Sequence, residues 1–175
     1  MFAFRAEVQS FAETFLESSL PPGWTLGFTR VGVHARRGDQ AKVISGTGNR
    51  PDFTVADSAY FTRAMEHFLS RYGRVQFIVA SDDLPWAREN VRAPSGLKSG
   101  RVNVTYTAAT HSPGQDLAIL ASCDHVIMSI GSYGWWAGWL SGGTVIYYKF
   151  WPSRAEALSI GVRPDTLFPP AWIEM

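Results

Sequence analysis

The stretch VGVHARRGD, residues 31–39, decides how this chain is interpreted. Its apolar, β-branched beginning is typical of a buried strand, and that strand runs into a histidine, two adjacent arginines, a glycine and an aspartate. The guanidinium groups of Arg36 and Arg37 repel each other, so they are best tolerated where a carboxylate or a phosphate binds them, and planar forks suit a diphosphate. The pattern therefore favours an anion site at the end of a strand. An exposed turn in which Asp39 neutralises one arginine is the alternative.

Two further apolar runs also end in polar or small residues. Residues 75–80, VQFIVA, lead into Asp82 and Asp83, and either aspartate can cap a helical turn over residues 84–90. Residues 125–128, HVIM, form a third predicted strand. The three strand ends together are typical of an open α/β sheet that binds its ligand at the carboxyl ends of its strands.

The turn after the third run consists of small residues and opens a predicted helix. Gly131 and Gly134 let the backbone approach a ligand. Ser132 stands at the start of the helix, where free N–H groups and the helix dipole favour a phosphate. We therefore expect this turn to contribute to the same anion site.

Helical and strand-like segments alternate along the rest of the chain. A helix is predicted before Pro21, and a second helix is capped by Asp57 and ends near Tyr72. Strands are predicted over residues 102–107, at an edge, and 144–148. The alternation predicts an α/β fold, a Rossmann-like parallel sheet with helices on both faces. Residues 40–51 are expected to form a mobile loop.

Composition excludes some classes of partner. With 46% hydrophobic residues, 18% charged residues and a net charge of +1, the chain is not basic enough to suggest nucleic acid or an anionic membrane surface. No apolar stretch approaches the roughly 20 residues of a membrane helix, and charges interrupt the first 20 residues, which excludes a signal peptide. Cys123, the single cysteine, cannot form an intrachain disulfide and is expected to be a buried small residue.

No pair of histidines has the spacing of metal ligands, and the adjacent Asp82 and Asp83 are not an Asp-x-Asp pair, so no metal site is predicted. His67 and His111 are expected to be surface or helix residues, and His125 a core histidine with its hydrogen bonds satisfied. The tryptophans at 135, 136 and 139 are expected to be core or domain-interface residues. Trp136 and Tyr133 are the candidates among the aromatic residues for touching a ligand.

The three motifs together resemble the galactoside α-1,2-fucosyltransferases. The resemblance rests on these segments, given in chain order: HARRGD at 34–39, DSAY at 57–60, FIVASDD at 77–83 with Trp86, Asp116 with SIGSYGWW at 129–136, GG at 142–143 and FPPAW at 168–172. They occur in the order of the family and cover nearly the whole chain. Ala35, Gln40 and Ala87 depart from the family pattern, at positions expected to affect packing or a disulfide more than phosphate binding.

The resemblance implies that residues 1–175 form a single GDP-fucose-binding domain, similar to the C-terminal half of a GT-B type glycosyltransferase. The upstream acceptor-side domain and membrane anchor of the family are expected to be absent. The implied enzyme is a galactoside 2-α-L-fucosyltransferase of protein glycosylation and carbohydrate metabolism. It transfers L-fucose from GDP-fucose in α-1,2 linkage to a terminal galactose of a β-galactoside glycan, with inversion and without a metal or other cofactor, at the lumenal side of the Golgi membrane.

The resemblance also assigns roles to residues. Arg36 would hold the β-phosphate with help from Arg37, His34 would lie against the nucleotide, Asp116 would accept hydrogen bonds from guanine, and Ser132 would meet the phosphate. Asp82 would support the nucleotide or the arginine loop. Gly131 and Tyr133 complete the predicted donor site. Arg36 and Asp39 are the predicted catalytic residues, Asp39 as a candidate general base or as a structural partner of the arginines.

Two alternatives remain at the level of sequence. One is a catalytically inactive remnant that binds GDP-sugars, because it would share every donor motif. The other is an adhesion module that displays the tripeptide Arg37-Gly38-Asp39, which would then project on an exposed loop instead of lining a cleft. The acceptor glycan and the oligomeric state are not predicted.

Overall fold

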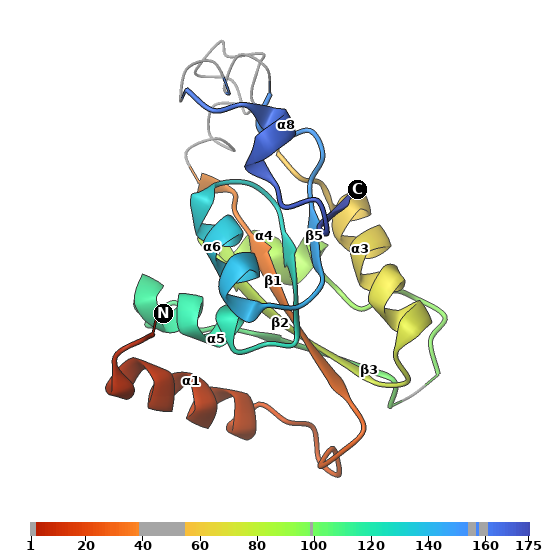
Figure 1. The fold of residues 1–175 in the computed structure, drawn as a ribbon. Helices are drawn as coiled ribbons and strands as arrows, with labels where there is room; N and C mark the ends of the chain where they lie inside the picture. The colour runs from red at the N-terminus through yellow and green to blue at the C-terminus, as the bar shows by residue number, and fades with distance from the viewer. Residues whose placement is uncertain (1–2, 39–54, 99, 154–156, 158–160) are drawn as a thin grey trace.

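The computed structural model describes residues 3–38, 55–98, 100–153, 157 and 161–175. Its strands are β1 (Thr29–Ala35), β2 (Val75–Ser81), β3 (Val102–Tyr106), β4 (His125–Met128), β5 (Val145–Tyr147) and β6 (Ile173–Glu174). They form one parallel sheet in the order β3-β2-β1-β4-β5-β6 (Figure 1). The chain order therefore reverses between β1 and β4, and such a reversal point is where open α/β sheets bind their ligands.

Helices cover both faces of the sheet. On one face lie α1 (Ala6–Ser18), α5 (Pro113–Ala121) and α6 (Ser132–Ser141), and on the other lie α3 (Ser58–Arg71) and α4 (Leu84–Asn90) (Figure 1). The division follows the alternation of side chains along β2, where Ile78 packs with α1 and α5 whereas Phe77 packs with α3. The predicted class, a Rossmann-like α/β sheet covered on both faces, is confirmed.

The pairing register of the strands brings the loops after β1, β2 and β4 to the same end of the sheet. In the centre of the sheet, His34 pairs with Ala80 of β2 on one side and with Met128 of β4 on the other. The loops that follow these three strands therefore begin at the same level. Ser129 N donates to His34 O at 3.0 Å, which joins the ends of β1 and β4 directly.

Most of the predicted elements are present. Asp57 caps α3, since its carboxylate accepts a hydrogen bond from Tyr60 N at 2.8 Å, and Asp83 caps α4 by accepting from Trp86 N at 3.1 Å. β3 lies at the edge, as predicted. β5 is shorter than the predicted 144–148, and the sequence analysis missed both β6 and the short helix α8 (Pro164–Leu167). The expected loop at 40–51 lies outside the described residues.

The predictions for single buried residues were partly right. Cys123 is buried, and His125 stacks on Phe68 while its Nδ1 accepts a hydrogen bond from Thr144 N. Trp136 and Trp139 are 39% and 52% exposed, so they are not core residues of the described chain.

None of the described helices is both long and apolar enough to cross a membrane.

Candidate functional site

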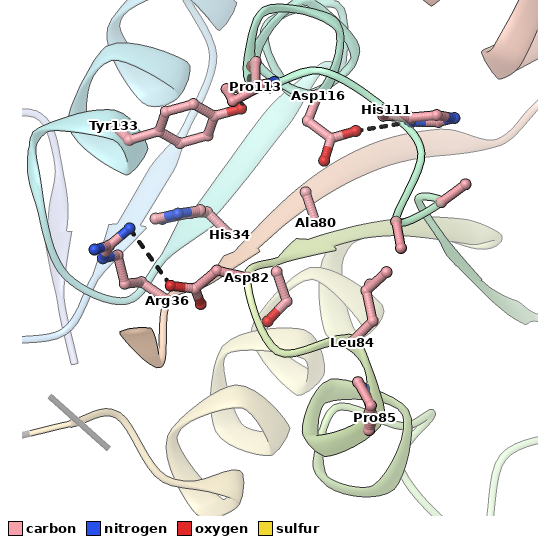
Figure 2. A pocket seen from close by; sticks show the side chains of 13 residues that line it. His34, Arg36, Ala80, Asp82, Leu84, Pro85, His111, Pro113, Asp116 and Tyr133 are labelled. Carbon is pink, nitrogen blue, oxygen red and sulfur yellow. Dashed lines mark hydrogen bonds and ion pairs between the residues drawn. The ribbon is translucent and has the colours of Figure 1, made fainter. Parts of the chain in front are cut away.

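A cavity of about 430 Å³ lies at the carboxyl ends of β1 and β2. The first turns of α4, α5 and α6 surround it (Figure 2). Its polar lining comprises His34, Arg36, Ser81, Asp82, His111, Asp116 and Tyr133. Five of the predicted donor-site residues therefore share one cavity: His34, Arg36, Asp82, Asp116 and Tyr133.

Arg36 and Asp82 form an ion pair at one end of the cavity. Arg36 Nη1 lies 3.4 Å from Asp82 Oδ2, and Arg37 N donates to Asp82 Oδ1 at 2.8 Å. Arg36 N in turn donates to the buried Ser129 Oγ at 2.8 Å. Asp82 thus holds the segment after β1 through both carboxylate oxygens. Its predicted support of the nucleotide or of the arginine loop stays a prediction. Ser129, for which no role was predicted, anchors the same segment.

Arg37 does not line the cavity. Its guanidinium lies 3.9 Å from the centre of the Trp86 ring, a cation–π contact on the α4 side of the sheet. Burial lowers the pKa of Arg37, and the carboxylates of Asp83 and Asp82 partly oppose that effect. The guanidinium groups of Arg36 and Arg37 therefore do not lie together. An assisting role of Arg37 at the phosphate stays a prediction.

His34 is 5% exposed and stays neutral near pH 7. Burial lowers its pKa to about 4; Asp82 acts against this shift and Arg36 adds to it. The His34 ring lies 5.1 Å from the ring of Tyr133, whose hydroxyl donates to Pro113 O at 2.6 Å. The neutral imidazole of His34 and the ring of Tyr133 therefore form an uncharged part of the cavity lining between its two polar ends.

The start of α6 is open. Gly131, the residue before the helix, has a φ of +89°, which favours glycine, and no side chain caps the helix. Ser132 is exposed at the first helical position. A Cβ on Gly131 would lie 3.9 Å from Arg36 Cδ, so the free N–H groups of the helix start lie close to Arg36.

Asp116 lies at the other end of the cavity, in the first turn of α5. Its Oδ2 accepts from Thr107 Oγ1 at 3.1 Å, and its Oδ1 lies 2.8 Å from His111 Nδ1 (Figure 2). The expectation that His111 is a surface or helix residue was wrong, because it precedes α5 and lines the cavity. In the sequence, only the spacing of five residues between His111 and Asp116 could have indicated their contact, and such a spacing is common by chance.

Asp39, the predicted general base, lies outside the described residues. In the described part of the chain no three His, Cys, Asp or Glu side chains are grouped so that they could hold a metal ion. Of the tripeptide 37–39, Arg37 and Gly38 are partly buried, and a Cβ on Gly38 would lie 3.1 Å from Asp82 Oδ2. This placement beside the cavity argues against an adhesion loop.

Comparison with known proteins identifies the family of the chain. The sequence model described as "Glycosyl transferase family 11" matches residues 25–174, which include every residue of the cavity lining. The chain belongs to glycosyl transferase family 11. Three similar proteins are Galactoside alpha-(1,2)-fucosyltransferase 1 of Saimiri sciureus, Galactoside alpha-(1,2)-fucosyltransferase 2 of Bos taurus and Galactoside 2-alpha-L-fucosyltransferase Sec1 of Mus musculus, at 39%, 34% and 30% identity.

The alignments with these three family 11 proteins cover 83%, 98% and 98% of this chain but only 38%, 48% and 45% of the relatives. The chain thus spans less than half the length of these relatives. Among solved structures, a family 9 glycosyl transferase from Veillonella parvula has a similar fold, with a TM-score of 0.51 and 16% identity. That similarity covers 84% of this chain and 36% of the other, and it supports the predicted GT-B-like fold.

Proposed function

We propose that this family 11 domain binds GDP-fucose, and that its protein transfers L-fucose in α-1,2 linkage to a terminal galactose of a glycan. The observation that carries the proposal is that Arg36 and the Asp116 carboxylate line opposite ends of one cavity, with the uncapped start of α6 beside Arg36, although Gly131 and Ser132 are not among the lining residues. A guanidinium at one end and a carboxylate at the other match the diphosphate and the base of a guanine nucleotide. The names of the relatives supply the sugar and the linkage.

The donor would lie across the carboxyl ends of the central strands. Arg36 would bind the β-phosphate through its planar fork, and the first N–H groups of α6, with Ser132, would contact the same group. Asp116 would accept hydrogen bonds from the guanine edge, and the rings of His34 and Tyr133 would flank the nucleotide between these ends. Arg37, stacked on Trp86, would contribute positive charge at a distance.

The chemistry needs fixed positive charge more than a nucleophile. As the bond to fucose breaks, negative charge grows on the β-phosphate and the sugar becomes oxocarbenium-like, so preorganised cations stabilise the transition state. Arg36, held by Ser129 and Asp82, is such a preorganised group. We propose that it takes the place that a metal ion has in other transferases. Direct attack by the galactose hydroxyl would then invert the configuration at the fucose carbon, with Asp39 as a candidate base.

A donor-binding domain without turnover is the second candidate. The chain spans less than half the length of the relatives with which it was compared, so donor binding by this chain and transfer by the whole protein are separate proposals. Both candidates use the same donor residues and differ only in transfer. From the family resemblance we also propose that the reaction belongs to protein glycosylation at the lumenal side of the Golgi membrane.

Calorimetric titration with GDP tests the proposal. We expect GDP to bind with equal affinity in EDTA and in magnesium, and ADP to bind on the order of tenfold or more weakly, because the base is selected by hydrogen bonds. Saturation with GDP-fucose should block further GDP binding. A strict requirement for magnesium would contradict the arginine-based diphosphate site, and equal affinity for ADP would contradict the assignment of the base.

A further inference from the structure

The carboxylate of Asp116 is held from both sides inside the cavity. Thr107, which is buried, donates to one oxygen, and Nδ1 of His111 lies 2.8 Å from the other. An ionised carboxylate only accepts hydrogen bonds, so Nδ1 of His111 is the donor. Each oxygen has lone pairs for more than one hydrogen bond, and Asp116 lines the cavity, so a donor on a ligand can share them.

The ring of His111 is itself fixed by a distant part of the chain. Phe11 and Phe15 of α1 contact it edge-on, with ring centres 5.0 and 5.3 Å away. Helix α1 packs on α5 through Ala12, Leu16, Ala118 and Ile119. The backbone N–H of His111 also donates to Ala108 O at 3.0 Å, in the turn before α5. The ring therefore has little freedom to turn away from Asp116.

We infer that His111 is a positioning residue that sets the nucleotide specificity of the cavity by holding Asp116 in the orientation that accepts hydrogen bonds from guanine. Guanine offers two neighbouring N–H donors on its pairing edge, which match two carboxylate oxygens. Adenine presents an acceptor nitrogen there, which a carboxylate repels. A site whose buried polar groups are fixed in this way rejects a ligand that leaves them unpaired. The inference rests on the proposed function, because it assumes that Asp116 meets the base.

By this inference, helix α1 contributes indirectly to recognition of the nucleotide. Its residues Phe11 and Phe15 precede the segment 25–174 that the family 11 sequence model matches. They lie outside the cavity lining and act only through the ring of His111.

The affinities of GDP and ADP, measured by calorimetry on the whole 175-residue chain, test this role. In His111→Phe a ring still fills the space between the two phenylalanines, but the donor to Asp116 is lost. We expect the affinity for GDP to fall on the order of tenfold and that for ADP to change by less than about twofold. His111→Asn keeps an N–H near the position of Nδ1 and should retain most of the preference for GDP.

A double-mutant cycle with Asp116→Ala separates positioning from direct contact. If His111 acts through Asp116, adding His111→Phe to Asp116→Ala should cause no further loss of GDP affinity. A full further loss would show that His111 touches the nucleotide itself and would overturn the inference. Thr107→Val, which removes the other donor with little change in shape, should lower the preference for GDP in the same direction. If His111→Phe does not fold, His111→Asn still tests the inference, because loss of the GDP preference in a folded His111→Asn would overturn it.

Two outcomes distinguish this inference from the function on which it rests. If the parent chain binds GDP no better than ADP, the proposed function fails. If the parent prefers GDP and His111→Phe, with an unchanged melting temperature, prefers it equally, only the role of His111 is refuted. An equal loss of GDP and ADP affinity would indicate a merely structural role and would also refute it.

Discussion

Between His34 and Arg37, consecutive side chains point to opposite sides of the sheet. His34 and Arg36 line the cavity, whereas Ala35 lies in the core on the α3 side and Arg37 stacks on Trp86. The sequence predicts positive charge at the end of this strand, because the apolar run and the arginines are local features. It could not predict that the arginines diverge, since their directions depend on Asp82 and Trp86, more than 40 residues away.

At the same scale, burial of His34 makes the stability of the domain depend on pH. Its pKa is about 4 in the folded chain and about 6.5 in an unfolded chain. Between these values the unfolded chain binds the extra proton, so the contribution of His34 to the free energy of unfolding is complete above about pH 6.5 and is lost as the pH falls toward 4. The loss is at most about 3 kcal/mol.

Urea denaturation between pH 7 and pH 4.5 measures this dependence on the parent and on His34→Gln. Burial also lowers the pKa values of His67 and His125, so the parent curve contains more than one contribution of the same sign. We expect the free energy of unfolding of His34→Gln to fall less steeply with decreasing pH. An identical slope in both proteins would show that His34 is not the neutral, buried group described above.

At the scale of elements, the contact between α6 and β1 requires a glycine. The sequence suggests that Gly134 lets the backbone approach a ligand, but in the structure Gly134 is buried against the strand. A Cβ at this position would lie 2.5 Å from His34 Nδ1 and 3.0 Å from Met128 Cβ. The glycine therefore serves the close approach of helix and strand, which also keeps the open start of α6 near Arg36.

Gly134→Ala should destabilise the fold by about 1–3 kcal/mol, the usual cost of overpacking a core. The melting temperature measures this. Gly114→Ala is the matched control, because Gly114 lies in the first turn of α5 with nothing within 4 Å of the position of the new Cβ. The control should be neutral or stabilising by up to about 1 kcal/mol. Equal melting temperatures of the two variants would contradict the packing described for α6.

The elements were easier to predict than their contacts. Periodicity located α3, because the residues that a helix buries follow a local period. The sequence could not show which aspartate caps α4, because Asp82 and Asp83 are equally well placed for it. In the structure Asp82 binds Arg36 and Arg37, and Asp83 caps the helix. The contacts of the His111 ring with α1 could not be predicted, because Phe11 and Phe15 lie about 100 residues earlier in the chain.

At the scale of the whole molecule, the strand order brings most of the predicted donor-site residues to one end of one sheet, whereas Arg37 points to the α4 side. The order β3-β2-β1-β4-β5-β6 brings the ends of β1, β2 and β4 together, so the segments after them share a cavity despite lying about 50 residues apart. The alternation of strands and helices predicts a sheet of this class. The lining of the cavity comes from four segments, residues 34–36, 80–85, 108–116 and 133, which no single motif contains.

Donor binding and transfer should therefore separate in this chain. We expect the 175-residue chain by itself to bind GDP-fucose and to transfer little or no fucose to a β-galactoside, because it spans less than half the length of the relatives compared. An assay with labelled GDP-fucose measures transfer. Turnover at about 1 per second or faster, typical of enzymes, would show that these residues form a complete active site. Asp39→Asn should then abolish transfer and leave GDP affinity nearly unchanged.

The account depends most on Arg36 as the diphosphate ligand, and the GDP affinity of Arg36→Lys tests it most directly. Lysine keeps the charge but loses the planar fork, so we predict that calorimetry will show a loss of on the order of tenfold or more. Arg71→Lys, at the exposed end of α3, should bind GDP like the parent. If Arg36→Lys also binds GDP like the parent, Arg36 does not hold the diphosphate and the central claim is wrong.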